Sequence, residues 1–122
     1  VVREIHFIAG GDSASVLVTD GVHECIAFSH PCTLKIGASL DEPLHALDHG
    51  TVVRSSDHRE SLRQQSRLGY FNYWVVARVA SVSKKCGTVR VGGIIIDGII
   101  LPGDVAEGEV VEFSVERLDI IL

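Results

Sequence analysis

The dipeptide Asp20-Gly21 constrains the fold more than any other feature, because it separates two runs rich in apolar residues, 14–19 and 22–29. Asp-Gly favours a two-residue turn between antiparallel strands, since both central positions of that turn take a positive φ angle. With such a turn Val16 faces Cys25, and the side of the hairpin that carries both residues is expected to pack in the core. The sequence therefore predicts an antiparallel β-hairpin early in the chain.

Short runs of β-branched and small residues between turn signals predict further strands. These runs cover residues 4–9, 51–54, 72–83, 88–96 and 109–121. Gly92-Gly93 is interpreted as a bulge or bend inside a strand, because paired glycines weaken regular pairing. The stretch 31–50 lacks the periodicity and is predicted to be a long connection, with a short helical turn at 44–49. The chain is thus predicted to be mainly β.

One helix is predicted, from Asp57 to Leu68. Asp57 and Glu60 have the spacing of a capping box, in which two side chains satisfy the free N–H groups at the start of a helix. Gly69 supplies a natural stop. The predicted helix has little apolar surface, so we expect it to lie on the surface of the protein or to plug the end of a barrel.

The 122 residues fit one domain, and a chain of this length buries most of its apolar surface without a metal or a disulfide. Its three cysteines are an odd number, which favours a reducing cytoplasm over a disulfide-bonded secreted protein. No apolar run approaches the roughly eighteen residues of a membrane span, so no contact with a membrane is predicted. The absence of methionine indicates that the initiator has been removed and leaves open whether a further segment precedes Val1.

Three strands, one helix and then strands that bend at glycines follow one another between Glu4 and Ile96. This order resembles the oligonucleotide/oligosaccharide-binding (OB) fold, a small antiparallel barrel with a helix between its third and fourth strands. The resemblance implies a single barrel domain over residues 1–122 that works by binding. The long connection 31–50 and the final strand 109–121 depart from the pattern, so another small barrel or an α+β sandwich is the alternative.

Positive charge and aromatic rings coincide between Arg54 and Arg90. This window has eight cations against two carboxylates, whereas the rest of the chain has three cations against fourteen carboxylates. It also holds four of the seven aromatic residues, and cations with flat rings suit an anionic or ring-bearing partner such as single-stranded nucleic acid. The predicted ligand-binding residues are Arg63, Arg67, Tyr70, Tyr73, Trp74, Arg78, Lys84, Lys85 and Arg90.

Trp74 and Arg78 share one side of the predicted strand 72–83, so we expect them to act together. A purely structural alternative is that the neighbouring rings cover one end of the barrel and that the arginines of the helix keep it soluble. The net charge of −5 favours this alternative, because an acidic protein repels phosphate at long range. The main hypothesis is nevertheless a non-catalytic binding module that contacts an anionic or ring-bearing ligand, or a protein.

The uneven charge distribution suggests a second hypothesis, self-association. A basic surface on one copy and the acidic remainder on another would complement each other, and such complementarity fixes register and partner choice. The protein would then form a homo-oligomer whose assembly depends on salt.

A third hypothesis is a metal-dependent enzyme. His45, Asp48 and His49 would share one face of the helical turn expected at 44–49, and two imidazoles with one carboxylate suit zinc or iron. Structural histidines are the more ordinary explanation. No cofactor is predicted and no catalytic residue is assigned, because the chain has neither a nucleophile elbow nor a phosphate-binding loop.

Overall fold

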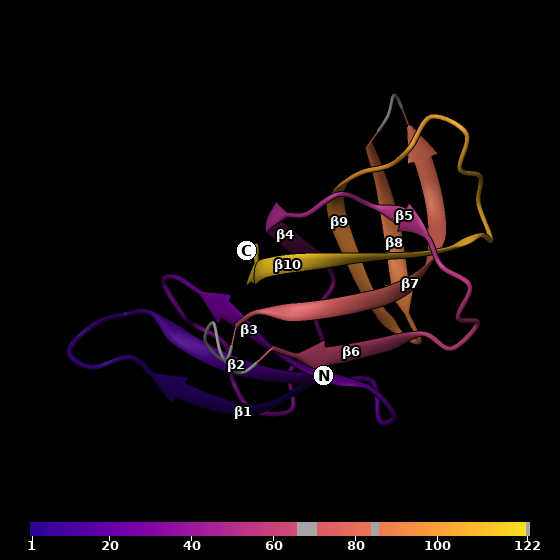
Figure 1. Cartoon of the computed structure of the whole chain (residues 1–122). Helices are drawn as coiled ribbons and strands as arrows, with labels where there is room; N and C mark the ends of the chain where they lie inside the picture. Colours follow the sequence, from indigo (N-terminus) through magenta and orange to yellow (C-terminus); the bar gives the residue numbers. More distant parts are fainter. Residues whose placement is uncertain (66–70, 84–85, 122) are drawn as a thin grey trace.

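The computed structural model describes residues 1–65, 71–83 and 86–121, which form ten strands and no helix. The strands are β1 (Val2–Phe7), β2 (Ala14–Thr19), β3 (Glu24–Ser29), β4 (Leu44–His49), β5 (Val53–Arg54), β6 (Ser61–Gln64), β7 (Tyr73–Ser83), β8 (Cys86–Val91), β9 (Ile94–Ile100) and β10 (Val110–Ile120). The prediction of a mainly β protein is confirmed (Figure 1).

The helix predicted from Asp57 to Leu68 is wrong, although its last three residues lie outside the described part of the chain. Ser61–Gln64 is strand β6, which pairs antiparallel with β7. The polar residues that suggested a helix cap make local turns instead: the Ser55 hydroxyl accepts the Asp57 N–H, and the Asp57 carboxylate accepts the Arg59 N–H. Short polar side chains satisfy backbone groups in a turn as readily as at a helix start, so their spacing alone did not identify a helix.

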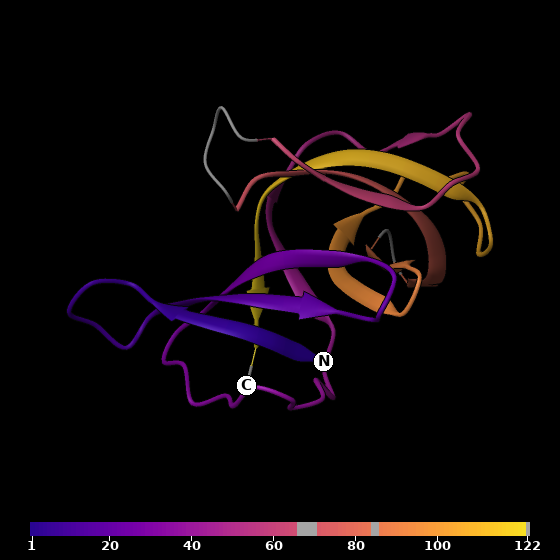
Figure 2. The ribbon, with the colours of Figure 1, turned by 90° about the horizontal axis from the view of Figure 1, so that it is seen from below.

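Five strands close into a small barrel in the order β10, β4, β9, β8, β7 and back to β10 (Figure 2). Four of the five contacts are antiparallel, and only β4 with β9 is parallel. A barrel removes the free edges that an open sheet would expose to other chains. The architecture is therefore a closed five-stranded β-barrel with additional strands attached to it.

Strand β10 organises the whole sheet, because it carries different partners along its length. On one edge its first half pairs with β7, and its last residues meet β3. On the other edge β5 and β4 follow one another. The alternation of buried and exposed side chains slips by one residue at Glu116-Arg117, where β10 passes from one group of partners to the other.

The first three strands do not belong to the barrel, contrary to the order that the OB resemblance implied. They form an antiparallel extension, β1-β2-β3, whose strand pairing with the barrel is that of β3 with β10 (Figure 1). Strand β10, which in sequence departs from the OB pattern, pairs with both the extension and the barrel. Local sequence patterns show where strands lie, but they do not show which distant strands pair.

The predicted hairpin is confirmed as β2 and β3, with a different register. Val16 pairs with Ala27 instead of Cys25, because the turn contains four residues. The Asp20 carboxylate accepts the N–H groups of Val22 and His23, which lengthens the turn by two residues. A shift of two residues keeps every side chain on its face, so Val16 and Cys25 are both buried as expected.

Gly92-Gly93 is a two-residue turn between β8 and β9 and not a bulge within one strand. Gly92 has a φ of 58°, a conformation that glycine adopts without steric cost. A Cβ at Gly92 would lie 2.4 Å from the Asp20 carboxylate, so the β2–β3 turn approaches this turn closely. The Gly93 N–H donates to Asp20 at 2.6 Å and joins the extension to the barrel.

The core fills the barrel and continues beneath the extension. Phe113, Ile96, Ile99 and Leu118 are its largest fully buried side chains. They belong to β9 and β10. Within the described residues, no helix is long and apolar enough to cross a membrane.

Candidate functional site

The structure describes five of the nine predicted ligand-binding residues, namely Arg63, Tyr73, Trp74, Arg78 and Arg90. The other four, Arg67, Tyr70, Lys84 and Lys85, lie outside the described residues. The five do not form one patch. Trp74 and Arg63 lie at one end of β7, Arg78 and Arg90 lie further along it, and Tyr73 points into the core.

Tyr73 is part of the hydrophobic core, with 4% of its surface exposed. Its hydroxyl oxygen accepts the Ile26 N–H at 2.8 Å and so satisfies a backbone group of β3 near the point where β3 follows β7 along β10. Desolvation by burial raises the pKa of Tyr73 to about 12. Its ring is not available to stack on a ligand.

Trp74 lies on the outer face of β7, as the alternation predicted, and it is half-buried. It pairs across the sheet with Arg63 on β6 and with Ser114 on β10. Arg63 is exposed, and no ion pair with a described residue holds its guanidinium. An exposed cation therefore stands beside the indole ring.

A second group of rings lies where β3 meets β10. The rings of Phe28 and Phe71 meet edge to face with centroids 5.9 Å apart, and the Arg117 guanidinium lies 4.0 Å from the Phe28 centroid. Asp119 binds Arg117 through both carboxylate oxygens, at 2.6 and 3.1 Å, and keeps its side chain in place. Phe28 and Trp74 both point outward from strands that follow one another along one edge of β10.

We call this surface the aromatic–arginine face, and it consists of Phe28, Arg63, Phe71, Trp74 and Arg117. Sequence reasoning identified Arg63 and Trp74 but missed the contribution of Phe28 and Arg117. These two residues lie near opposite ends of the chain, and their contact depends on the pairing of β3 with β10. No local pattern contains that information.

Arg78 and Arg90 lie directly opposite each other on β7 and β8, and both point toward Glu60. The Arg78 Nε and the Arg90 Nη1 are each 3.4 Å from a carboxylate oxygen of Glu60. Glu60 also accepts the Gly92 N–H at 2.8 Å. The two arginines are therefore partly neutralised within the chain.

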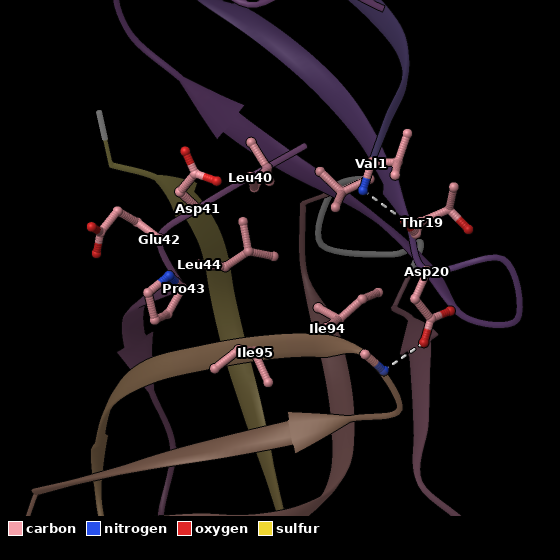
Figure 3. A pocket seen from close by; sticks show the side chains of 12 residues that line it. Val1, Thr19, Asp20, Leu40, Asp41, Glu42, Pro43, Leu44, Ile94 and Ile95 are labelled. Atoms are coloured by element: carbon pink, nitrogen blue, oxygen red, sulfur yellow. Dashed lines mark hydrogen bonds between the residues drawn. The ribbon is translucent and has the colours of Figure 1, made fainter. Parts of the chain in front are cut away.

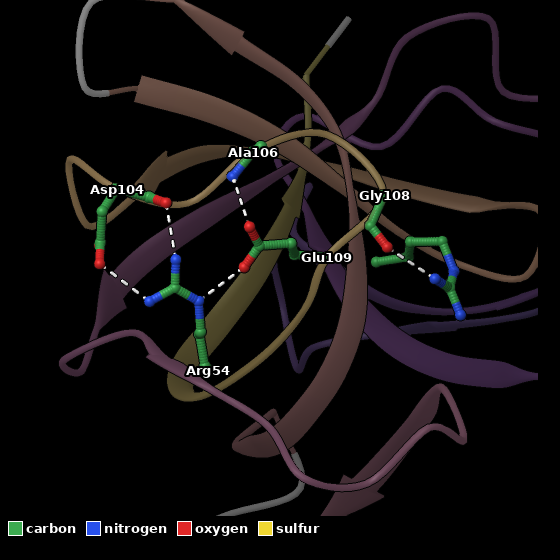
Figure 4. A network of polar contacts seen from close by, with 6 residues as sticks. Arg54, Asp104, Ala106, Gly108 and Glu109 are labelled. Atoms are coloured by element: carbon green, nitrogen blue, oxygen red, sulfur yellow. Dashed lines mark hydrogen bonds and ion pairs between the residues drawn. The ribbon is translucent and has the colours of Figure 1, made fainter.

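Arg54, the first cation of the basic window, is bound entirely within the chain (Figure 4). It donates to Glu109 at 2.6 Å and, through separate nitrogens, to the side chain and the carbonyl oxygen of Asp104. These hydrogen bonds lower the pKa of both carboxyl groups, and they hold the loop between β9 and β10 against β5. Arg54 consequently serves the loop and not the aromatic–arginine face.

The helical turn predicted at 44–49 is wrong, since these residues form strand β4. The histidines of the metal hypothesis therefore lie on an extended strand. His45 and His49 are four residues apart on an extended strand, which separates them by about 13 Å. No group of three or more His, Cys, Asp or Glu side chains that could hold a metal occurs in the described part of the chain. His45, Asp48 and His49 therefore do not converge.

Both histidines instead close the barrel where pairing is weakest. The parallel contact of β4 with β9 involves only Leu44–Ile96 and His45–Asp97. His45 Nδ1 donates to the Asp97 carboxylate at 2.9 Å, and His49 Nε2 accepts the Ile100 N–H at 3.0 Å. Side chains thus supply the contacts that backbone pairing does not make along this seam.

A cavity of about 330 Å³ opens where β2 meets the starts of β4 and β9 (Figure 3). Leu44, Ile94 and Ile95 contribute apolar lining, while the carboxylates of Asp41 and Asp20 lie on opposite sides. Three backbone N–H groups outweigh the desolvation of Asp20 and lower its pKa to about 2. The acidic rim is unsuited to an anion, so this cavity is separate from the predicted binding surface.

No family model, no curated protein and no solved structure matches this chain. The geometry described above is accordingly the basis for any functional proposal.

Proposed function

We propose that this protein is a non-catalytic binding module whose aromatic–arginine face contacts a ring-bearing, negatively charged partner. One arrangement carries the proposal: Phe28, which contacts the Phe71 ring and the Arg117 guanidinium, and Trp74, which pairs with Arg63, belong to strands that follow one another on one edge of β10. Rings fixed by packing and cations beside them are the groups that stack on bases and attract phosphates.

We further propose that the five-stranded barrel is OB-like. The closed barrel of five strands supports this proposal, because the OB fold is also a five-stranded barrel. OB barrels carry their ligands on the outer surface of the strands and on the loops beside it. The aromatic–arginine face lies at the end of β7 where β6 and β3 extend the barrel. A rigid sheet would hold the rings in place without a ligand, which reduces the entropy cost of binding.

The charges favour a short partner over a long nucleic-acid strand. Arg54, Arg78 and Arg90 have carboxylate partners within the chain, and Arg117 is bound to Asp119. Of the cations on the aromatic–arginine face, Arg63 contributes most of the uncompensated charge. Stacking should therefore supply more of the affinity than phosphate contacts do, at roughly 1 to 3 kcal/mol per stacked base.

The test uses a fluorescein-labelled oligothymidylate of about eight nucleotides at low salt, with binding measured by anisotropy. Trp74 is the only tryptophan of the chain, so quenching of intrinsic fluorescence reports binding at this face. Trp74→Leu should weaken binding by at least fivefold, and Arg63→Ala should weaken it as well.

Arg3→Ala is the matched control, because Arg3 is an exposed cation on β1 that pairs with Glu24 and is not one of the residues of this face. It lowers the net charge as Arg63→Ala does and should leave the affinity within twofold. Absence of binding at low salt, or equal losses in Arg3→Ala and Arg63→Ala, would refute the nucleic-acid form of the proposal.

Self-association remains a second candidate, and one observation favours it. The hairpin of β1 and β2 projects away from the barrel, and Phe7 and Ile8 near its tip are 60% and 40% exposed (Figure 2). Exposed apolar residues of this size often mark a contact with another protein. Sedimentation at two salt concentrations tests it, and a monomer in both, with or without Phe7→Ser, counts against it.

A further inference from the structure

Arg78 and Arg90 form a cationic pair that the sheet alone would not stabilise. They are directly opposite each other in the antiparallel pairing of β7 with β8. Like charges in such positions repel each other and destabilise the pairing. An anion between the two guanidinium groups removes this penalty, and in this structure the anion is the Glu60 carboxylate.

Glu60 occupies a position that has the donors of an oxyanion site. Its oxygens receive the Gly92 N–H from the β8–β9 turn and face the Nε of Arg78 and an Nη1 of Arg90. The Glu60 side chain is only 16% exposed, whereas those of Arg78 and Arg90 are 33% and 41% exposed. The carboxylate therefore lies at the bottom of the site, and the guanidinium groups lead from it to solvent.

The fit of the carboxylate to the arginines is incomplete. Both arginine contacts are 3.4 Å long, and charge-assisted hydrogen bonds between nitrogen and oxygen are usually about 2.7–2.9 Å. Arg78 donates also to the Gly108 carbonyl at 2.6 Å, which keeps its guanidinium in place. Each guanidinium has five N–H groups, so most of these donors have no partner among the described residues. Glu60 supplies one negative charge against the two arginines, and Asp20, which accepts the adjacent Gly93 N–H, is a second carboxylate at this turn.

We propose that Arg78, Arg90 and the Gly92 N–H form a binding site for a phosphate-type oxyanion, which Glu60 fills from within the chain. A tetrahedral oxyanion with two negative charges neutralises both arginines and offers oxygens to all three groups. Glu60 acts as a tethered competitor, because a side chain held nearby has an effective concentration in the millimolar range or above. The site is separate from the aromatic–arginine face and does not depend on the function proposed for that face.

The experiment titrates inorganic phosphate into ¹⁵N-labelled protein at constant ionic strength, with chloride as the replaced anion. The Gly92 amide and the Arg78 Nε–H signals report binding directly. Glu60→Gln keeps the size and the acceptor oxygen of the side chain but removes its charge, so this variant should bind phosphate at least tenfold more tightly than the wild-type protein. Glu60→Gln combined with Arg90→Ala should lose that gain.

Glu24→Gln is the control for net charge, since Glu24 is an exposed carboxylate that pairs with Arg3. A gain in Glu24→Gln equal to that in Glu60→Gln overturns the proposal, and so does a Glu60→Gln variant that binds no more tightly than the wild-type protein. If Glu60→Gln does not fold, the wild-type protein decides: phosphate and not chloride must shift the Gly92 amide, and no shift overturns the proposal. A phosphate monoester, tested in parallel, shows whether the site accepts a phosphate attached to a larger molecule or the free ion only.

Discussion

Tyr73 offers the sharpest test of how the extension is joined to the barrel. Tyr73→Phe keeps the ring in the core and removes one oxygen, the acceptor of the Ile26 N–H. A partly buried donor that loses its acceptor costs about 1–3 kcal/mol, because part of its desolvation is no longer offset by a hydrogen bond. We expect the free energy of unfolding of Tyr73→Phe at pH 7 to be lower than that of the wild-type protein by this amount.

The pH dependence gives a second, independent part of this prediction. Burial raises the pKa of Tyr73 from 10.0 to about 12, so the folded state favours the protonated phenol. The corresponding stability is fully present below pH 10 and is lost as the pH rises toward 12, when the unfolded chain gains from ionisation. Two pKa units correspond to roughly 3 kcal/mol. Tyr73→Phe should lack this loss, so the difference between the two proteins should shrink above pH 10.

Urea unfolding followed by circular dichroism at pH 7, 9, 10 and 11 measures both parts. Cys25 is present in both proteins, and its pKa is raised from 9.0 to about 12, mainly by desolvation, so both should begin to lose stability near pH 9. The comparison cancels this shared contribution. A cost below about 0.5 kcal/mol at pH 7, together with identical pH profiles, would refute the role assigned to the Tyr73 hydroxyl.

Three further predictions concern the seam and the loop. Gly98→Ala should lower the free energy of unfolding by about 1–3 kcal/mol, because Gly98 has a φ of 77° and a Cβ there would lie 2.6 Å from the His45 ring. In urea unfolding of the double variant, His45→Ala should relieve part of this cost, and strictly additive costs of the two substitutions would contradict the explanation. His49→Ala should cost about 0.5–1.5 kcal/mol and speed hydrogen exchange at Ile100, and unchanged exchange there would show that His49 does not hold β9. Arg54→Ala should raise the pKa of Asp104 and Glu109 toward ordinary values, as measured by carboxyl NMR titration. The loss of stability should be largest above the ordinary carboxyl pKa range and should shrink as the pH falls through the lowered pKa values; unchanged pKa values would contradict the network.

Local sequence patterns predicted most strands but few of their partners. The hairpin at Asp20-Gly21 and the long final strand depend on neighbouring residues, and both are present. The register of that hairpin differs because a side chain, the Asp20 carboxylate, takes part in the turn. Strand β4 was missed although Leu44 and Ala46 alternate with half-buried residues, because the preceding Pro43 suggested a short helical turn.

The candidate sites were less predictable than the strands for a physical reason. Trp74 was placed on an outer face correctly, since alternation along one strand decides which way a side chain points. The contact between Phe28 and Arg117 requires the parallel meeting of β3 and β10, and the position of Glu60 requires β6 to begin where β8 ends. Such contacts follow from long-range pairing, which the composition of a single segment does not encode.

The shared use of β10 has a consequence for synthesis in the cell. All strands that pair with β10 precede it in the chain and are translated earlier. The barrel therefore cannot close on the ribosome until residues 110–120 have left the exit tunnel. Until then β3, β4 and β7 have unsatisfied edges, and a nascent chain stalled at residue 105 should be digested by protease far faster than a chain that includes β10. The barrel therefore becomes resistant to protease only after its fifth strand, β10, has been made.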